Sequence, residues 1–308
     1  MPRAIDLGET VTVIVSKLNP FDRTPEAAVD RMGGSVGQEL PIVDGFVADV
    51  PAASVDDLAE VANVRGLTLN SQVRVEGQYG QNSGVASAVY TEVSRASKAW
   101  ENGTTGNGVT VALIDTGVDV SGDLAGRVIG AADFSGENAP YTDSYGHGTF
   151  VAGLIAGTGA GSNGGIKGVA PDARIFSVKI AGKDGTTDLF RLLAALEFVA
   201  IHKDAFGIRV LNLSLGTDST QSYKVDPLNF AVERVWNSGV VVVAAAGNRG
   251  NTPGAITSPA DDPYVISVGA TDDRTTPSLN DDTLASFSSV GPTGDGFAKP
   301  DVVAPGKS

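Results

Sequence analysis

From residue 91 onward, short apolar runs alternate with segments whose apolar residues recur every three or four positions. The runs predict strands at 109–114, 174–180, 210–213, 240–246 and 264–268, and the periodic segments predict helices at 148–157, 188–203 and 227–238. Nearly continuous apolar strands are typical of a parallel sheet that is covered on both faces. Residues 91–308 are therefore predicted to form a doubly wound α/β domain, with its functional side chains at the carboxyl ends of the strands.

Residues 1–76 are predicted to form a separate, small α+β domain. The β-branched run at 10–15 indicates a strand, and Thr24-Pro25 indicates a helix start with Thr24 as the cap. The later predicted elements are strands at 36–40, 46–50 and 67–75 and a second helix capped by Ser54. The resulting order, βαββαβ, predicts a ferredoxin-like layout.

Residues 77–90, GQYGQNSGVASAVY, are rich in Gly, Gln and Ser and show no periodicity. Such a segment indicates an exposed connector between the two predicted domains. The first ten residues lack the apolar run of a signal peptide, and no stretch approaches the roughly 20 apolar residues of a membrane helix. We therefore expect no association with a membrane.

The composition excludes several classes of function. Lys plus Arg number 22 and Asp plus Glu number 36, so the net charge of −14 argues against nucleic acid as a partner. The chain has no cysteine, which excludes disulfides, thiolate metal sites and cysteine nucleophiles. It has only two histidines, which exclude a multi-histidine metal centre.

Two side chains stand where an α/β fold places its chemistry. Asp115 ends the first strand of the large domain, and His147 lies between two glycines at the start of a helix. Flanking glycines allow a tight turn and leave the imidazole accessible. Taken singly, each residue is equally consistent with a capped turn or a structural histidine. His202 is interpreted as a solvated residue in the last turn of a helix.

Weaker candidates follow the neighbouring strands. Asn248 comes directly after a buried apolar run and is either a turn residue or a positioned hydrogen-bond donor. Ser214, Leu215 and Gly216 follow another strand, where small residues can leave the backbone free to pair with an extended peptide.

Together these segments resemble the subtilisin-like serine proteases over nearly the whole chain. The matching motifs, in the family's order, are VALIDTGVD, GHGTFVAGLIAG, KGVAPDARIFSVKI, LNLSLG, VVAAAGN, SVGA, FSSVGP and DVVAPG. Residues 10–76 are similar to the family's prodomain, an inhibitory chaperone. The resemblance implies a subtilisin-like catalytic domain at 91–308, a prodomain at 1–76 and a processing region within 77–90.

The resemblance also implies roles for single residues. Asp115 would orient His147, and His147 would act as general base towards a serine hydroxyl. The amide of Asn248 would stabilise the oxyanion. The substrate-binding residues that it implies are Ser214, Leu215 and Gly216 along the peptide backbone, Ala245, Ala246 and Gly247 in the wall of the primary pocket, and Thr257 near its base.

One departure from the family pattern concerns the nucleophile. The family carries it in a Gly-Thr-Ser motif after the APG segment, and no Gly-Thr-Ser triplet occurs in these 308 residues. We interpret the chain as a protease precursor truncated before its catalytic serine, and expect the 308-residue chain itself to be inactive. The alternative is a pseudoprotease or a module that binds and inhibits a protease.

No cofactor is expected for catalysis, and structural calcium has no clear motif. The segment after the histidine helix offers Asn163 but no carboxylate, and calcium favours several charged oxygen ligands. Six later aspartates are candidate ligands but are interpreted first as solvated loops: Asp261, Asp262, Asp272, Asp273, Asp281 and Asp282. The resemblance further implies a polypeptide substrate, the prodomain in the active-site cleft, a monomer and secretion.

Overall fold

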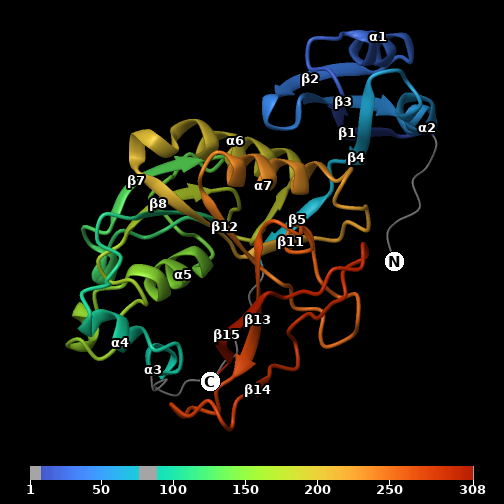
Figure 1. The fold of residues 1–308 in the computed structure, drawn as a ribbon. Helices are drawn as coiled ribbons and strands as arrows, with labels where there is room; N and C mark the ends of the chain where they lie inside the picture. Colours follow the sequence, from blue (N-terminus) through green and yellow to red (C-terminus); the bar gives the residue numbers. More distant parts are fainter. Residues whose placement is uncertain (1–7, 76–88, 308) are drawn as a thin grey trace.

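The computed structural model describes residues 8–75 and 89–307. Residues 10–69 form a small unit in the order β1-α1-β2-β3-α2-β4. Its strands β1 (Thr10–Lys17), β2 (Ser35–Leu40), β3 (Gly45–Pro51) and β4 (Val64–Leu69) make an antiparallel sheet in the order β2-β3-β1-β4. Helices α1 (Thr24–Arg31) and α2 (Val55–Ala59) lie at the top of Figure 1, away from the large unit.

The predicted strand at 67–75 is wrong in one respect, because the structure divides it into two. Its first part belongs to β4, whereas β5 (Gln72–Val75) leaves the small sheet and joins a second, three-stranded sheet. There it pairs antiparallel with β9 (Thr186–Asp188) and with β11 (Leu215–Thr217). The small unit therefore extends its last strand into the large one.

The helix caps of the small unit also differ from the prediction. Thr24 lies inside α1 and not at its cap, and its amide and hydroxyl both donate to Asp22 Oδ1. Ser54 occupies the N-cap position of α2 without a side-chain hydrogen bond to the helix. The acceptor at the start of α1 is therefore the carboxylate of Asp22, and not the hydroxyl of Thr24.

The large unit is built on an eight-stranded, mainly parallel sheet in the order β14-β13-β12-β10-β6-β8-β7, with β15 also paired to β13 (Figure 1). Its strands are β6 (Thr110–Asp115), β7 (Val128–Asp133), β8 (Arg174–Lys179), β10 (Ile208–Leu213), β12 (Val241–Ala245), β13 (Ile266–Asp272), β14 (Thr283–Leu284) and β15 (Val302–Lys307). All the neighbouring pairs are parallel except β13 with β14. This arrangement is the α/β architecture that the alternating pattern predicts.

Helices cover both faces of this sheet. Ala112 and Ile114 of β6 face α6 (Leu189–Phe206) and α7 (Pro227–Asn237), whereas Val111 and Leu113 face α5 (His147–Ala156). This alternation within one apolar strand explains why the whole of β6 is buried. Two short helices, α3 (Tyr90–Val93) and α4 (Ala96–Glu101), precede β6.

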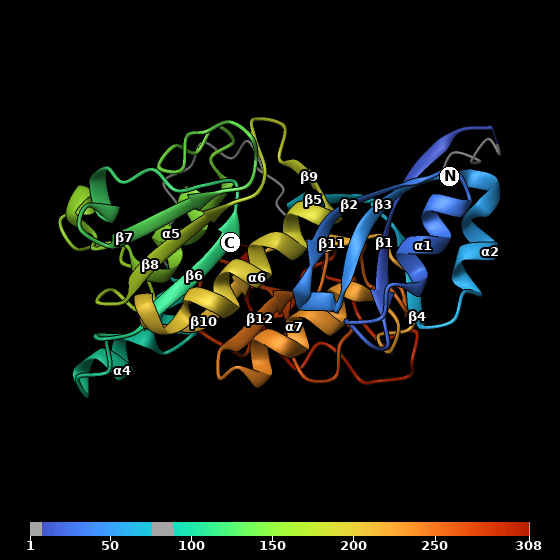
Figure 2. The same ribbon diagram turned by 90° about the horizontal axis from the view of Figure 1, so that it is seen from above.

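The small sheet packs on α6 and α7, beside the large sheet (Figure 2). Ile14, Ile42 and Val43 share one buried apolar cluster with these helices, while the opposite face of the small sheet packs on α1 and α2. The guanidinium of Arg234 in α7 donates to the Pro41 carbonyl and pairs with Asp44. A common core and specific polar contacts therefore join the two units.

The predictions for the connector at 77–90 and for His202 can also be compared with the structure. The connector expected at 77–90 lies almost entirely outside the described residues, and Tyr90 already belongs to α3. His202 is half-buried and not fully solvated: its ring stacks on Phe198, with centroids 4.0 Å apart, and Nδ1 contacts the Phe198 carbonyl. Among the helices of residues 8–75 and 89–307, none combines the length and apolar character that crossing a bilayer requires.

Candidate active site

Asp115 and His147 meet at the carboxyl edge of the large sheet. Asp115 is the last residue of β6, and His147 is the first residue of α5, which begins one residue earlier than the sequence predicts. The imidazole Nδ1 lies 2.8 Å from Oδ1 and 2.9 Å from Oδ2 of the carboxyl group. The two side chains are buried, with Asp115 1 % and His147 5 % exposed.

The electrostatics of Asp115 follow from this burial. Removal from water raises the pKa of the Asp115 carboxyl, and the hydrogen bonds from His147 and from the Thr116 amide oppose that rise. Because Nδ1–H donates to the carboxyl, a neutral His147 presents Nε2 as its acceptor nitrogen. This is the tautomer that a general base requires.

A second carboxylate, which the sequence analysis did not single out, holds the start of α5. Oδ2 of Asp143 accepts from both the amide and the hydroxyl of Thr149, and Oδ1 accepts from the Gly146 amide. Burial would raise the pKa of Asp143, but these hydrogen bonds outweigh it, so that the pKa lies below its usual value. Asp143 thus stays ionised at the N-terminus of the helix that carries His147.

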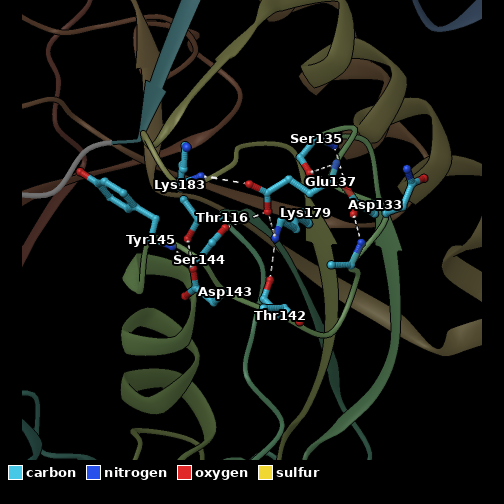
Figure 3. A network of polar contacts seen from close by, with 12 residues as sticks. Thr116, Asp133, Ser135, Glu137, Thr142, Asp143, Ser144, Tyr145, Lys179 and Lys183 are labelled. Atoms are coloured by element: carbon cyan, nitrogen blue, oxygen red, sulfur yellow. Dashed lines mark hydrogen bonds and ion pairs between the residues drawn. The ribbon is translucent and has the colours of Figure 1, made fainter.

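Thr116 joins this cap to the strand that carries Asp115. Its hydroxyl donates to Asp143 Oδ1 at 2.8 Å and accepts from the Gly148 amide at 2.9 Å. Figure 3 shows Thr116 and Asp143 within a network of polar contacts that includes several residues of the loop leading to α5. In the sequence, Thr116 directly follows Asp115 and Asp143 lies four residues before His147. These spacings alone did not reveal that the Thr116 hydroxyl donates to the Asp143 carboxylate.

Two of the three residues expected to bind a peptide backbone pair with another segment of this chain. Leu215 and Gly216 lie in β11 and pair with Val75 and Arg74 of β5, while Ser214 immediately precedes that strand. On its other side β5 pairs with β9, so it is the middle strand of three. A segment of the small unit is therefore inserted as a strand between two edges of the large unit.

The side chains of β5 alternate between buried and accessible. Val73 is fully buried in the same apolar cluster as Leu189, Leu192 and Leu215, whereas Gln72 and Arg74 are exposed. A strand bound at this place is held by main-chain pairing on both edges and by one aliphatic side chain.

The residues predicted for the primary pocket and the oxyanion lie at the end of β12 or in the segments that follow it. Ala245 ends β12, and the carbonyl of Ala246 accepts from the Thr257 amide at 3.1 Å. Gly247 has φ of 109°, and a Cβ there would lie 2.8 Å from the Thr257 side chain. Asn248 follows at intermediate exposure. Thr257 thus lies beside the Ala245–Gly247 segment.

The acidic residues considered for calcium are not all solvated. Asp262 and Asp273 are fully buried, and Asp261 accepts from the Asn229 amide. In the described part of the chain, no three Asp, Glu or His side chains are grouped closely enough to hold a metal ion. Asp272 is also buried, at the end of β13, so the interpretation of these residues as solvated loops is wrong for Asp262, Asp272 and Asp273.

Comparison with known proteins places this geometry in a family. Residues 106–308 match the model of the Subtilase family, which is peptidase family S8, and the chain belongs to that family. It is 40 % identical over 263 residues to the serine protease AprX of Bacillus subtilis, and 37 % identical over 212 residues to Subtilisin Savinase of Lederbergia lenta. An alkaline protease of Alkalihalobacillus alcalophilus is 35 % identical over 259 residues.

The matches cover different shares of the relatives. The AprX match spans 83 % of this chain but 57 % of AprX, and the alkaline protease match spans 83 % of this chain and 60 % of that protein. The Savinase match spans 69 % of each. The chain thus spans little more than half of AprX and of the alkaline protease.

Proposed function

We propose that these residues belong to the precursor of a secreted serine endopeptidase that hydrolyses peptide bonds with an Asp-His-Ser triad. The observation that carries the proposal is the buried Asp115–His147 hydrogen bond at the carboxyl edge of the sheet, in a member of the Subtilase family. Asp115 orients the imidazole and stabilises its charged form. His147 Nε2 takes the proton of the serine hydroxyl and returns it to the leaving amine.

The nucleophile in this proposal is a serine that follows residue 308. Its support is the lack of a Gly-Thr-Ser triplet in the 308 residues, together with the family's placement of that triplet after an APG segment such as 304–306. The side-chain amide of Asn248 donates to the oxyanion of the tetrahedral intermediate. Ala245, Ala246, Gly247 and Thr257 form the pocket for the side chain before the cleaved bond.

The small unit acts in this proposal as an inhibitory prodomain. Its support is the pairing of β5 with both β9 and β11, since a peptide cannot add to either edge while β5 is there. Cleavage in the segment at 77–90 then separates the two units. The monomeric state and secretion come with the family resemblance, and one relative carries the name minor extracellular protease Epr.

A fluorophosphonate probe, which reacts with activated serines, tests the proposal in the complete gene product. We expect covalent labelling of one serine beyond residue 308, and loss of labelling in His147→Ala. Because the 308 residues contain only two histidines, His202→Ala is the matched control and should label normally. The 308-residue chain alone should remain unlabelled and uncut.

The outcomes separate the proposal from its alternative. A complete product in which no serine reacts, or which reacts equally well after His147→Ala, would contradict the protease assignment. If such a product still bound an active subtilase through the small unit, the binding or inhibiting function would be the one supported.

A further inference from the structure

Lys179 has no part in the chemistry described so far, yet its ammonium group is fully buried beside the active site. It ends β8 and lies opposite Asp115 in the register of β6 with β8. A buried ammonium is strongly unfavourable unless it is paired and hydrogen-bonded. Nζ of Lys179 lies 2.7 Å from Glu137 Oε2 and donates to the Thr142 carbonyl at 2.7 Å.

Both acceptors belong to the loop of residues 134–146, which joins β7 to α5. Figure 3 shows Lys179 between the two arms of this loop, with Glu137 above it and Thr142 below. Glu137 also accepts from the Ser144 hydroxyl at 2.8 Å and from the Lys183 amide at 3.2 Å. The hydrogen bond from Lys179 and then that from Ser144 hold the pKa of Glu137 below its usual value. An ionised Glu137 thus ties both arms of the loop to one buried cation.

The loop carries the group that caps the histidine helix. Thr142, whose carbonyl Lys179 holds, directly precedes Asp143, and Asp143 accepts from the amides of Gly146 and Thr149. The Thr142 carbonyl is also packed on the residues after Asp115, because a Cβ on Gly117 would lie 2.5 Å from it and 3.1 Å from Lys179 Cδ. Lys179 therefore packs beside Gly117, which follows Asp115, and also holds the loop that leads to His147.

We propose that Lys179 is a positioning residue: by anchoring Glu137 and the Thr142 carbonyl, it keeps His147 within hydrogen-bonding distance of Asp115. This inference rests on the proposed function for its catalytic meaning, but its geometry does not depend on the nucleophile. Without the ammonium group, Glu137 and the Thr142 carbonyl lose their shared partner, and Asp143 no longer holds the start of α5 in a fixed position relative to β6.

The Nδ1 proton of His147 reports this directly, in the 308-residue chain and without any activity. Labelling with ¹⁵N-histidine gives signals from His147 and His202 only, and His202 serves as an internal reference because its Nδ1 contacts the Phe198 carbonyl. In the wild-type protein we expect a downfield Nδ1–H signal of His147 that exchanges slowly with water. In Lys179→Met we expect its exchange to accelerate by about tenfold or more, as for a weakened local structure, with His202 unchanged.

Lys183→Met is the matched control, because residue 183 contacts Glu137 through its backbone amide, which the substitution keeps. Glu137→Gln removes the counter-charge of Lys179 at a partly exposed position. It should also accelerate the exchange of the His147 Nδ1 proton, and it provides the test should Lys179→Met not fold. An unchanged His147 signal in folded Lys179→Met, or in Glu137→Gln, would overturn the inference. Failure of the probe to label the complete gene product would instead overturn the proposed function and leave this result standing.

Discussion

Gly148 and Gly117 lie in such close contact that a Cβ on Gly148 would stand 2.1 Å from the Gly117 carbonyl oxygen. It would also lie 3.3 Å from the Cβ of Asp115. The first turn of α5 thus packs directly on the chain that leaves β6, and only glycine allows this approach. This close backbone contact lies directly beside the Asp115–His147 hydrogen bond.

Gly148→Ala should therefore destabilise the protein and separate the pair. We expect a loss of about 1–3 kcal/mol in the free energy of unfolding, the usual size for forced overpacking. Gly153→Ala is the matched control in the same helix, where a Cβ meets no atom within 4 Å. That change should stabilise the protein by about 0.5–1 kcal/mol because it favours the helical backbone. Urea unfolding measures both values, and equal effects of the two changes would contradict this packing argument.

Val73→Asp should release β5 from its place between β9 and β11. The side chain of Val73 is fully buried among Leu189, Leu192 and Leu215, and burial of an unpaired carboxylate is strongly unfavourable. We expect the amides of Gly216 and Arg74, which lie opposite each other in β11 and β5, to exchange with deuterium at least about tenfold faster, since each loses its partner strand, whereas the Thr217 amide donates to the Ser258 carbonyl. Gln72→Ser, at an exposed position of the same strand, should leave their exchange almost unchanged.

Asp262 should make the stability of the protein fall as the pH rises towards neutrality. Burial raises the pKa of Asp262 to about 7, from 3.8, and the nearby carboxylates of Glu233 and Asp261 add to the rise. The folded state therefore retains a proton that the unfolded state releases, and stability is lost progressively between about pH 4 and pH 7.

Asp262→Asn removes this titration. The free energy of unfolding of the variant, relative to the wild type, should increase between pH 5 and pH 8, by about 1–3 kcal/mol in total. Parallel stability curves for Asp262→Asn and the wild type would show that the buried carboxyl does not titrate in this range.

Much of the fold could be predicted because its signals are local. The apolar strands and the glycines around His147 can be recognised from neighbouring residues. Where a helix or strand was predicted, its ends lie within three residues of the observed ones, apart from the far end of β13 and the strand at 67–75 that the structure divides. Asp115 at a strand end and His147 at a helix start could be placed in the same way. Their contact did not follow from any local pattern: it was implied by the family resemblance, and the structure shows it as the hydrogen bond between His147 Nδ1 and the Asp115 carboxyl group.

The missed features depend on contacts between distant segments. The split of residues 67–75 arises because β5 finds partners more than 100 residues later, which no local pattern reveals. Five strands of the large unit were not predicted: β7, β9, β11, β14 and β15. Each is short, interrupted by glycine or rich in polar residues, so period alone does not identify it. The partners of Lys179 and of Asp262 likewise lie in other elements, and a lysine at the end of an apolar strand is equally consistent with a solvated residue.

The most direct test of the catalytic role of the Asp115–His147 pair is the rate of peptide hydrolysis by the complete gene product after Asp115→Asn. Asparagine keeps the shape of the side chain but cannot hold His147 in the tautomer that accepts a proton. We predict that kcat falls by roughly 10⁴-fold with KM nearly unchanged, which is the size of the effect known from other serine-protease triads. A variant that keeps its kcat within a few fold of the wild type would show that the Asp115–His147 pair does not perform the catalysis.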